Sequence, residues 1–261
     1  MYELIRSEQW AYAPGMFEDL KAVVYDFTAG RAGEHCRTFL GQGDHGWRGQ
    51  LVCDDYSGYK AGFVQGITEV GCAAHARRKF FDLHVNHQSP LAGQALQFFG
   101  ALYEIEREVR DLDTEQRLQL RQLKSKPVAR ALHTWMQGQR LLVTNGTAIA
   151  RALDYSLKRW VALTRYLDDG QLPIDNNGIE NQMRPVALGR KNWLFAGSLR
   201  AGQRAAAIMS LIQSARLNGH DPYAYLNDVL TRLPTHKASQ VGELLPHRWN
   251  ASVGPAWSIS S

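Results

Sequence analysis

A long run of helical periodicity without any strand pattern is the feature that most constrains the fold of this chain. Between about residue 84 and residue 170, apolar residues recur at spacings of three and four, as on one buried helix face. Four helices are expected there. Ser89-Pro90 begins the first, as a capping residue followed by proline, and the others begin at Thr114, Pro127 and Thr147. The middle of the chain is therefore predicted to be an all-α block.

The segment before this block has the pattern of a mixed α/β domain. Short runs at 22–27, 49–53 and 68–72 contain β-branched and aromatic residues and are predicted to be strands. The first of them is expected to form a hairpin with residues 9–13, because Pro14-Gly15 is a turn signal. Helices are expected at 31–40 and 73–83. The order predicts an α/β fold with an all-α insertion.

The segment after the block is predicted to be mainly helical. Asn176 and Asn177 are expected to cap a short helix that Pro185 interrupts. A further helix is expected at 205–217, where Asn218-Gly219 ends it, and Asp221-Pro222 begins the last one. Beyond about residue 246 the chain is rich in Pro, Gly and Ser and is expected to be loose.

Charge and composition exclude some classes of protein without identifying a function. The 261 residues include 30 Lys and Arg against 25 Asp and Glu, and this mild basic excess suits a polyanion partner. Three scattered cysteines give no disulfide framework, and no apolar stretch is long enough to span a membrane. The N-terminus lacks the pattern of a signal peptide. A cytoplasmic protein with no membrane partner is the expectation.

Two carboxylates are candidates for chemistry. Asp54 follows the strand predicted at 49–53, and side chains at strand ends face the crevice where open α/β sheets bind ligands. Glu180 is placed on the first turns of a helix, with Arg184 one turn later. The simpler alternatives remain open. Asp54-Asp55 can open a solvated turn, and Glu180 and Arg184 can form an ordinary surface pair.

Two groups of cations are candidates for contact with a phosphate backbone. Basic residues interleaved with aromatic ones suit phosphate binding and base stacking, although solvated charges and a buried aromatic core are equally open. The candidate DNA-binding residues are Arg77, Arg78, Lys79, Arg184, Arg190, Lys191 and Trp193. Cys72 and His75, with His84 and His87, have the residue types of a zinc site, but Cys72 as a small buried side chain is the favoured interpretation.

Four motifs together resemble the insertion-sequence 66 family of DDE transposases. They are LVCDDYSGY at 51–59, GCAAHARRKF at 71–80, IDNNGIENQMRPVALGRKNWLF at 174–195 and LNGHDP at 217–222. The resemblance extends from about Trp10 to about Pro246. It implies an RNase H-like core with an all-α insertion and a helical C-terminal element.

The resemblance also implies a chemistry. DDE enzymes cleave and transfer DNA strands with two divalent metal ions, normally Mg²⁺, held by two aspartates and one glutamate. Asp54 matches the second aspartate and Glu180 the glutamate, so both are the expected catalytic residues and metal ligands. Asp55 falls where the family commonly has glycine. The implied partners are DNA of the element ends and the target, and the protein can form homo-oligomers or associate with intact transposase.

The implied domain boundaries follow the same motifs. Residues 1–84 are expected to begin the RNase H-like core, 85–168 to form the insertion and 169–216 to complete the core. Residues 217–246 are expected to form the C-terminal element and 247–261 a loose tail.

One departure from the family concerns its first aspartate. That residue lies in an Asp-Glu-Thr motif on the central first strand, and this chain has no such motif upstream of Trp10. Asp26 matches a position outside the catalytic set. The chain is therefore expected to be an N-terminally truncated transposase of a mobile element, catalytically incomplete alone. One alternative is a non-catalytic DNA-binding or regulatory fragment that acts on intact transposase. Another is an RNase H-like nuclease that uses substitute ligands.

Overall fold

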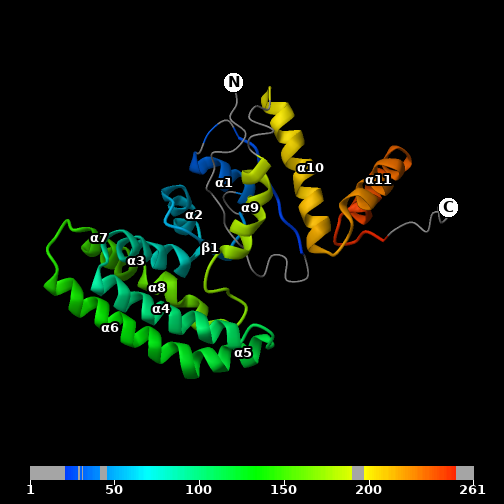
Figure 1. Ribbon diagram of the computed structural model, residues 1–261. Helices are drawn as coiled ribbons and strands as arrows, with labels where there is room; N and C mark the ends of the chain where they lie inside the picture. The colour runs from blue at the N-terminus through cyan, green and yellow to red at the C-terminus, as the bar shows by residue number, and fades with distance from the viewer. Residues whose placement is uncertain (1–20, 29, 31, 42–45, 190–196, 251–261) are drawn as a thin grey trace, which may run out of the picture. The chain divides into compact units, whose positions relative to one another are not determined.

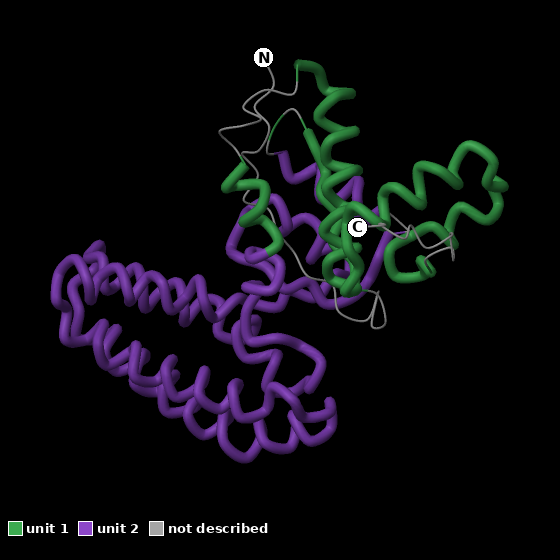
Figure 2. The backbone as a smooth tube through the Cα atoms, turned by 45° about the vertical axis from the view of Figure 1, so that its right-hand side comes forward, with its two compact units in different colours: residues 1–8, 17–31, 182–261 green, residues 9–16, 32–181 purple. Residues whose placement is uncertain are grey.

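The computed structural model describes residues 21–28, 30, 32–41, 46–189 and 197–250. Over these residues the protein is mostly helical and contains one two-stranded sheet (Figure 1). The chain divides into two compact units (Figure 2). Unit 1 comprises residues 1–8, 17–31 and 182–261, and unit 2 comprises residues 9–16 and 32–181.

The sheet lies in unit 2 and consists of two parallel strands. β1 (Gln50–Cys53) pairs with β2 (Thr68–Gly71), in agreement with the strands predicted at 49–53 and 68–72. A 3-10 turn, η2 (Ser57–Tyr59), and α2 (Lys60–Val64) connect them, and α1 (Gly33–Leu40) precedes them.

Both faces of β1 are buried, which explains its continuous apolar sequence. Val52 belongs to the large core of the helical block, whereas Leu51 and Cys53 belong to a smaller cluster with side chains of α1 and α2. A strand covered on both faces has no polar alternation. The short apolar run at 49–53 is therefore typical of a strand that is covered on both faces.

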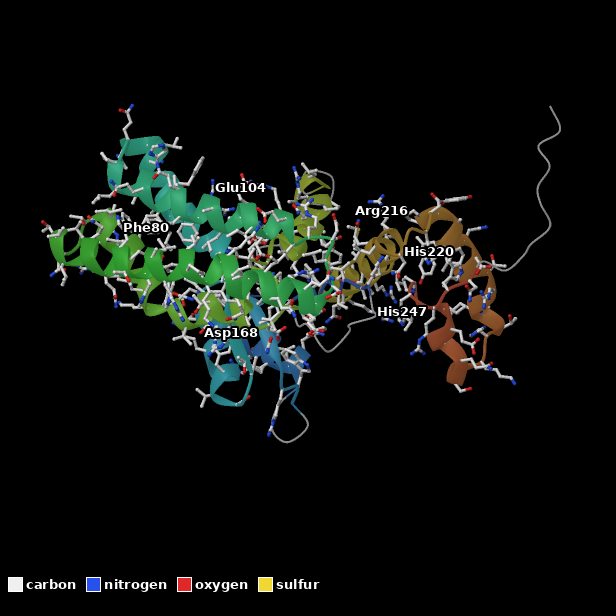
Figure 3. The ribbon with its side chains drawn as sticks, turned by 90° about the horizontal axis from the view of Figure 1, so that it is seen from below. Phe80, Glu104, Asp168, Arg216, His220 and His247 are labelled. Atoms are coloured by element: carbon white, nitrogen blue, oxygen red, sulfur yellow. The ribbon has the colours of Figure 1, made fainter. Side chains whose placement is uncertain are left out.

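The helical block follows β2 within the same unit. It contains α3 (Ala73–His87), α4 (Pro90–Glu108), α5 (Thr114–Leu120), the π-helical turn η3 (Arg121–Ser125), α6 (Lys126–Leu142), α7 (Ala148–Lys158), α8 (Trp160–Thr164) and the 3-10 turn η4 (Arg165–Asp168). Figure 1 shows α3, α4 and α6 running side by side, and Figure 3 shows Phe80 of α3 among the helices of the block. No strand lies between residues 85 and 168, all of which the structure describes.

Three predicted helix starts coincide with side-chain caps. The side chains of Ser89, Asp113 and Thr147 each accept a hydrogen bond from the backbone N–H three residues later. Each satisfies a donor that has no partner within the helix. The apolar faces of these helices then meet in one core, where Phe80, Leu132, Met136 and Leu153 are fully buried.

Three predicted boundaries differ from the structure. Pro127 does not begin a separate helix, because α5, η3 and α6 follow one another without a break. The helix predicted at 147–167 is divided at Arg159, whose side chain is buried in ion pairs. Pro185 lies inside α9 (Asn177–Gly189) and does not end it.

The run at 22–27, predicted to be a strand, is extended in unit 1 but belongs to no sheet of the described residues. Val23, Tyr25 and Phe27 alternate with exposed residues, as in a strand with one buried face. Its backbone bonds to side chains of α10 (Leu199–Leu217) instead: Ser214 Oγ lies 3.0 Å from Val23 N, and Ser210 Oγ lies 2.8 Å from Tyr25 N. The expected partner of the hairpin, 9–13, lies outside the described residues.

The C-terminal part of unit 1 has its own small core. α11 (Pro222–Arg232) is followed by the 3-10 turns η5 (Leu233–Thr235) and η6 (Ala238–Leu244). Tyr225 of α11 is buried in a cluster with Ala215, Val229, Leu244 and Trp249. The rings of His220 and Trp249 meet edge to face 4.9 Å apart, and Figure 3 shows where His220 lies. Of the helices described, none has the length and apolarity needed to cross a membrane.

Candidate functional site

The first candidate carboxylate lies at the end of β1. Asp54 is half-buried, and its Oδ1 accepts a hydrogen bond from Tyr56 N at 3.0 Å. This contact is the side-chain turn expected of a residue that ends a strand. Within the described part of the chain, its Oδ2 accepts no hydrogen bond. One oxygen thus fixes the loop, and the other makes no hydrogen bond to a described residue.

The neighbouring strand leads directly into α3 at the same edge of the sheet. Cys72 N donates to Cys53 O at 3.2 Å, which extends the strand pairing by one residue beyond β2. α3 then begins at Ala73, so His75 lies in its first turn. Since the carboxyl ends of parallel strands meet at one edge, Asp54 and His75 belong to the same edge.

The second candidate carboxylate reaches that edge from a distant part of the sequence. Glu180 lies in the first turn of α9, and its Oε1 is 3.5 Å from Nε2 of His75. The segment before it is joined to α3 through Ala73 N, which donates to Ile174 O at 3.0 Å. Both predicted catalytic carboxylates therefore lie in unit 2, at the carboxyl edge of the two strands.

The donor chemistry of this edge fits a hard divalent cation, but the described residues do not provide a complete set. Carboxylate oxygens are the ligands that Mg²⁺ prefers in proteins. Among the described residues, no group of three or more His, Cys, Asp or Glu side chains is arranged to hold a metal ion. Asp54 and Glu180 are thus two oxygen donors of the kind that such an ion takes.

The zinc interpretation of Cys72 and His75 is not supported by the geometry. Cys72 Sγ lies 3.0 Å from Asn176 Oδ1, and His75 faces Glu180. Cys72 is 1% exposed, as expected of a small buried side chain. His84 and His87 lie at the far end of α3, in its last turn.

A buried arginine that the sequence did not indicate lies beside the Asp54 loop. Arg159 is 7% exposed, its Nη1 lies 3.4 Å from Asp55 Oδ1, and it also pairs with Glu69 of β2. Its guanidinium lies over the ring of Tyr155. The only signal in the sequence was a charged residue between apolar ones, which a surface helix shares.

The cations predicted on α3 differ in their surroundings. Arg78 is exposed, the guanidinium of Arg77 lies 5.5 Å from the Phe81 ring centre, and Lys79 Nζ lies 4.4 Å from the Tyr155 ring centre. Arg184 is exposed on α9, and Glu180 faces His75 instead of forming the surface pair with Arg184. Arg190, Lys191 and Trp193 lie outside the described residues, so their predicted role stays a prediction.

Comparison with known proteins gives matches along most of the chain. A model of the family described as "Transposase IS66 family" matches residues 5–204, and a model described as "IS66 C-terminal element" matches residues 210–247. No solved structure is significantly similar to the chain.

Three relatives come from Sinorhizobium fredii (strain NBRC 101917 / NGR234). The uncharacterized protein y4hP is 39% identical over 245 residues, which cover 87% of this chain and 44% of the relative. The uncharacterized proteins y4jD and y4qI are 37% and 36% identical, over 90% and 92% of this chain and 47% and 46% of their own lengths. The chain thus spans about half the length of the curated relatives it matches.

Proposed function

The chain belongs to the IS66 transposase family, and we propose on this basis that it acts in DNA transposition through Asp54 and Glu180. One observation carries the proposal. Asp54 directly follows β1, and Glu180 contacts His75 in the first turn of α3, which follows β2. The carboxyl ends of parallel strands are where α/β sheets bind their ligands. The family implies DNA as the partner, and DDE transposases generally use divalent metal ions.

We assign the two carboxylates to metal binding within an RNase H-like core. Asp54 Oδ2 and the Glu180 oxygen that does not face His75 would hold Mg²⁺. The ion supplies charge stabilisation to the attacking and leaving oxygens of an in-line displacement at phosphorus. The protein contributes the fixed positions of both side chains, because Asp54 is held by its own turn and Glu180 by the first turn of α9.

The proposed DNA contacts are the cations of α3 and of the chain that follows Glu180. Arg77, Arg78 and Lys79 lie on α3, within a few turns of His75, and Arg184 follows Glu180 on α9. Arg190, Lys191 and Trp193 complete the proposed set. Contacts of this kind go to the phosphate backbone, so binding is expected to be independent of sequence and to weaken steeply with salt. Homo-oligomers, or association with intact transposase, belong to the same proposal.

A chimera tests the catalytic assignment. This chain would replace the matched 245-residue region of y4hP, and cleavage of DNA that carries element ends would be measured with Mg²⁺ or Mn²⁺. Asp54→Asn or Glu180→Gln is expected to lower the cleavage rate by about a hundredfold or more, because each removes a charge that stabilises the transition state. The chain alone is expected to cleave far more slowly, since the family site needs three carboxylates and only two are assigned.

The matched control is Glu104→Gln, an exposed glutamate of α4 labelled in Figure 3. It is expected to leave cleavage unchanged. Full cleavage by the Asp54→Asn and Glu180→Gln chimeras would overturn the assignment. A chimera that binds DNA in a salt-sensitive manner but never cleaves it would favour the non-catalytic DNA-binding alternative.

A further inference from the structure

The segment that leads to Glu180 is held by contacts from three other elements. Ile174 O accepts from Ala73 N at the start of α3. Asp175 Oδ2 accepts from the hydroxyl of Tyr103, on α4, at 2.6 Å. Asn176 is bonded to Cys72, and Glu180 faces His75. Ile174, Asp175, Asn176 and Glu180 are thus each tied to the helical block or to the end of β2.

The Cys72–Asn176 contact is reciprocal and buried. The thiol lies 3.0 Å from Asn176 Oδ1, and Asn176 N donates to Cys72 Sγ at 3.5 Å. Their exposed fractions are 1% and 3%. A thiol is a weak donor and a weak acceptor, so it can make both contacts when protonated. A thiol is already protonated near neutral pH, and burial raises the pKa of Cys72 further, to about 11.

Asn176 connects the Cys72 contact to the backbone of Glu180 through its carbonyl group. Its carbonyl accepts from Ile179 N at 3.0 Å and from Glu180 N at 3.1 Å, so it forms the first turn of α9. A shift of Asn176 therefore moves the Glu180 backbone with it. Cys72 thus constrains the main chain of Glu180 through Asn176, whereas His75 contacts its carboxylate.

His75 is placed to hold one carboxylate oxygen. Its Nε2 lies 3.5 Å from Glu180 Oε1, and its Nδ1 is buried without a hydrogen-bond partner. Glu180 Oε2 makes no hydrogen bond in the described part of the chain. A carboxylate held at one oxygen has fewer rotamers, and its other oxygen keeps a defined direction.

We propose that Cys72 and His75 are positioning residues for Glu180, which they fix through its backbone and its side chain respectively, and that neither binds a metal ion itself. The inference rests on the proposed role of Glu180 as a metal ligand. It accounts for the Cys-x-x-His spacing, because Cys72 ends the strand and His75 lies one helical turn later on the same side. Partners of metal ligands typically contribute about 10- to 100-fold to metal affinity.

The test is a titration of the full chain with Mn²⁺, followed by electron paramagnetic resonance of the free ion. Asp54→Asn and Glu180→Gln define the site and are expected to abolish the specific binding. Cys72→Ala and His75→Ala are each expected to weaken binding about tenfold or more. Cys72→Ser keeps a donor at the same position, and His75→Gln keeps an N–H near Nε2, so both are expected to recover most of the affinity.

Control variants use the same residue types elsewhere. Cys36→Ala in α1 and His87→Ala at the end of α3 are expected to leave the Mn²⁺ dissociation constant unchanged. Thermal unfolding without metal is recorded for every variant. A purely structural role would lower the unfolding midpoint without changing the dissociation constant measured well below it.

The possible failures can be told apart. Mn²⁺ binding that is absent, or unaffected by Asp54→Asn and Glu180→Gln, would overturn the proposed function and this inference with it. Binding that depends on those two carboxylates but not on Cys72 or His75 would overturn the inference alone. Stoichiometric Zn²⁺ binding that is lost in both Cys72→Ala and His75→Ala would also overturn it, because these residues would then be ligands.

Discussion

At the scale of the residue, Arg121 is the most completely buried charge that the structure describes. It is 2% exposed, forms two bonds to Glu106 at 2.9 and 2.6 Å, and donates to the backbone carbonyls of Tyr166, Asp169 and Leu172. One guanidinium thus connects α4, η3 and the chain that leads from η4 to the Glu180 segment. Arg121 stabilises the fold mainly by donating hydrogen bonds to these buried acceptors, since a buried ion pair by itself adds little stability.

We expect Arg121→Met to lower the free energy of unfolding by about 3 to 5 kcal/mol, because the largely buried Glu106 carboxylate and three backbone carbonyls would lose their donor. Urea denaturation followed by circular dichroism measures the loss. Lys124→Met is the matched control, since the Lys124–Glu108 pair joins the same two elements but is about half exposed. It is expected to cost less than about 1 kcal/mol. Equal losses in the two variants would contradict the explanation.

The Cys72 thiol gives a prediction about alkaline pH. Its pKa rises from an ordinary value of 9.0 to about 11 in the folded protein, mainly because it is buried. Between these values the unfolded thiol has lost its proton and the folded one has kept it. The contribution of the protonated thiol to the free energy of unfolding is therefore fully present below pH 9. It falls as the pH rises toward 11, by at most about 1.4 kcal/mol per pH unit for one thiol.

Cys72→Ser removes this ionisation, so we expect a shallower fall of the unfolding free energy between pH 9 and pH 11. Urea denaturation at several pH values, with a reducing agent present, measures the slope. The slope that remains comes from other buried groups, including Cys36, whose pKa burial also raises to about 11. Identical slopes in both proteins would show that the thiol is not protected from ionisation.

Sequence patterns located the two carboxylates but not the groups around them. Asp54 was predicted at a strand end and Glu180 on the first turn of a helix, and both lie there. The contacts that hold the Glu180 segment were not predicted, because hydrogen bonds such as Tyr103–Asp175 join residues that only the tertiary fold brings together. Resemblance to a family assigns types of residue to positions, whereas contacts depend on packing.

At the scale of the element, local signals predicted helix starts better than helix ends. Caps such as Ser89 and Thr147 act through bonds to their own helix, so a short stretch of sequence suffices. Arg159 divides α7 from α8 because ion pairs with Asp55 and Glu69 hold it against the sheet. Pro185 lies inside α9, which continues on both sides of it. Neither outcome is visible in the local sequence.

The packing of α10 against the extended segment 21–28 gives a prediction about glycine. A Cβ at Gly202 would lie 2.2 Å from the ring of Phe27, which is 5% exposed. We expect Gly202→Ala to destabilise the protein by about 1 to 3 kcal/mol, since the ring must move within a packed interior. Thermal unfolding monitored by circular dichroism measures the effect.

The controls are Gly100→Ala in α4 and Gly138→Ala in α6, where an added Cβ would meet nothing within 4 Å. Alanine restricts the unfolded chain more than glycine does, so these variants are expected to be more stable by up to about 1 kcal/mol. A stabilising Gly202→Ala would show that the segment does not pack on α10.

At the scale of the whole molecule, each unit has a hydrophobic core of its own. The larger core contains residues such as Phe80 and Leu153 and lies entirely in unit 2, whereas the core around Tyr225 and Leu244 lies entirely in unit 1. The helical pattern of the middle of the chain predicted the first core. The division into units was not predicted, because unit 1 joins segments from both ends of the sequence.

Separate cores lead us to expect two unfolding transitions in differential scanning calorimetry. Leu153→Ala removes a fully buried side chain of unit 2 and is expected to lower one transition, at a cost of about 2 to 5 kcal/mol. Leu244→Ala is expected to lower the other transition. A single transition that both variants lower equally would mean that the two units unfold together.

The polar side chains that α10 and its C-terminal cap present to the extended segment 21–28 have a spacing that nearly matches the repeat of that segment. Ser210, Ser214 and Asn218 recur every four residues and bond to Tyr25, Val23 and Lys21, which recur every two. Four helical residues advance about 6.0 Å and two extended residues about 6.7 Å, so the two periods nearly coincide.

The bonding side chains of the helix therefore stay in register with the extended segment over only a few repeats, because the mismatch of about 0.7 Å per repeat accumulates. An insertion of one residue between Val23 and Tyr25 would turn the alternate side chains the wrong way, whereas an insertion of two would restore the facing. Length variation at this place in related chains is therefore expected to come in even numbers.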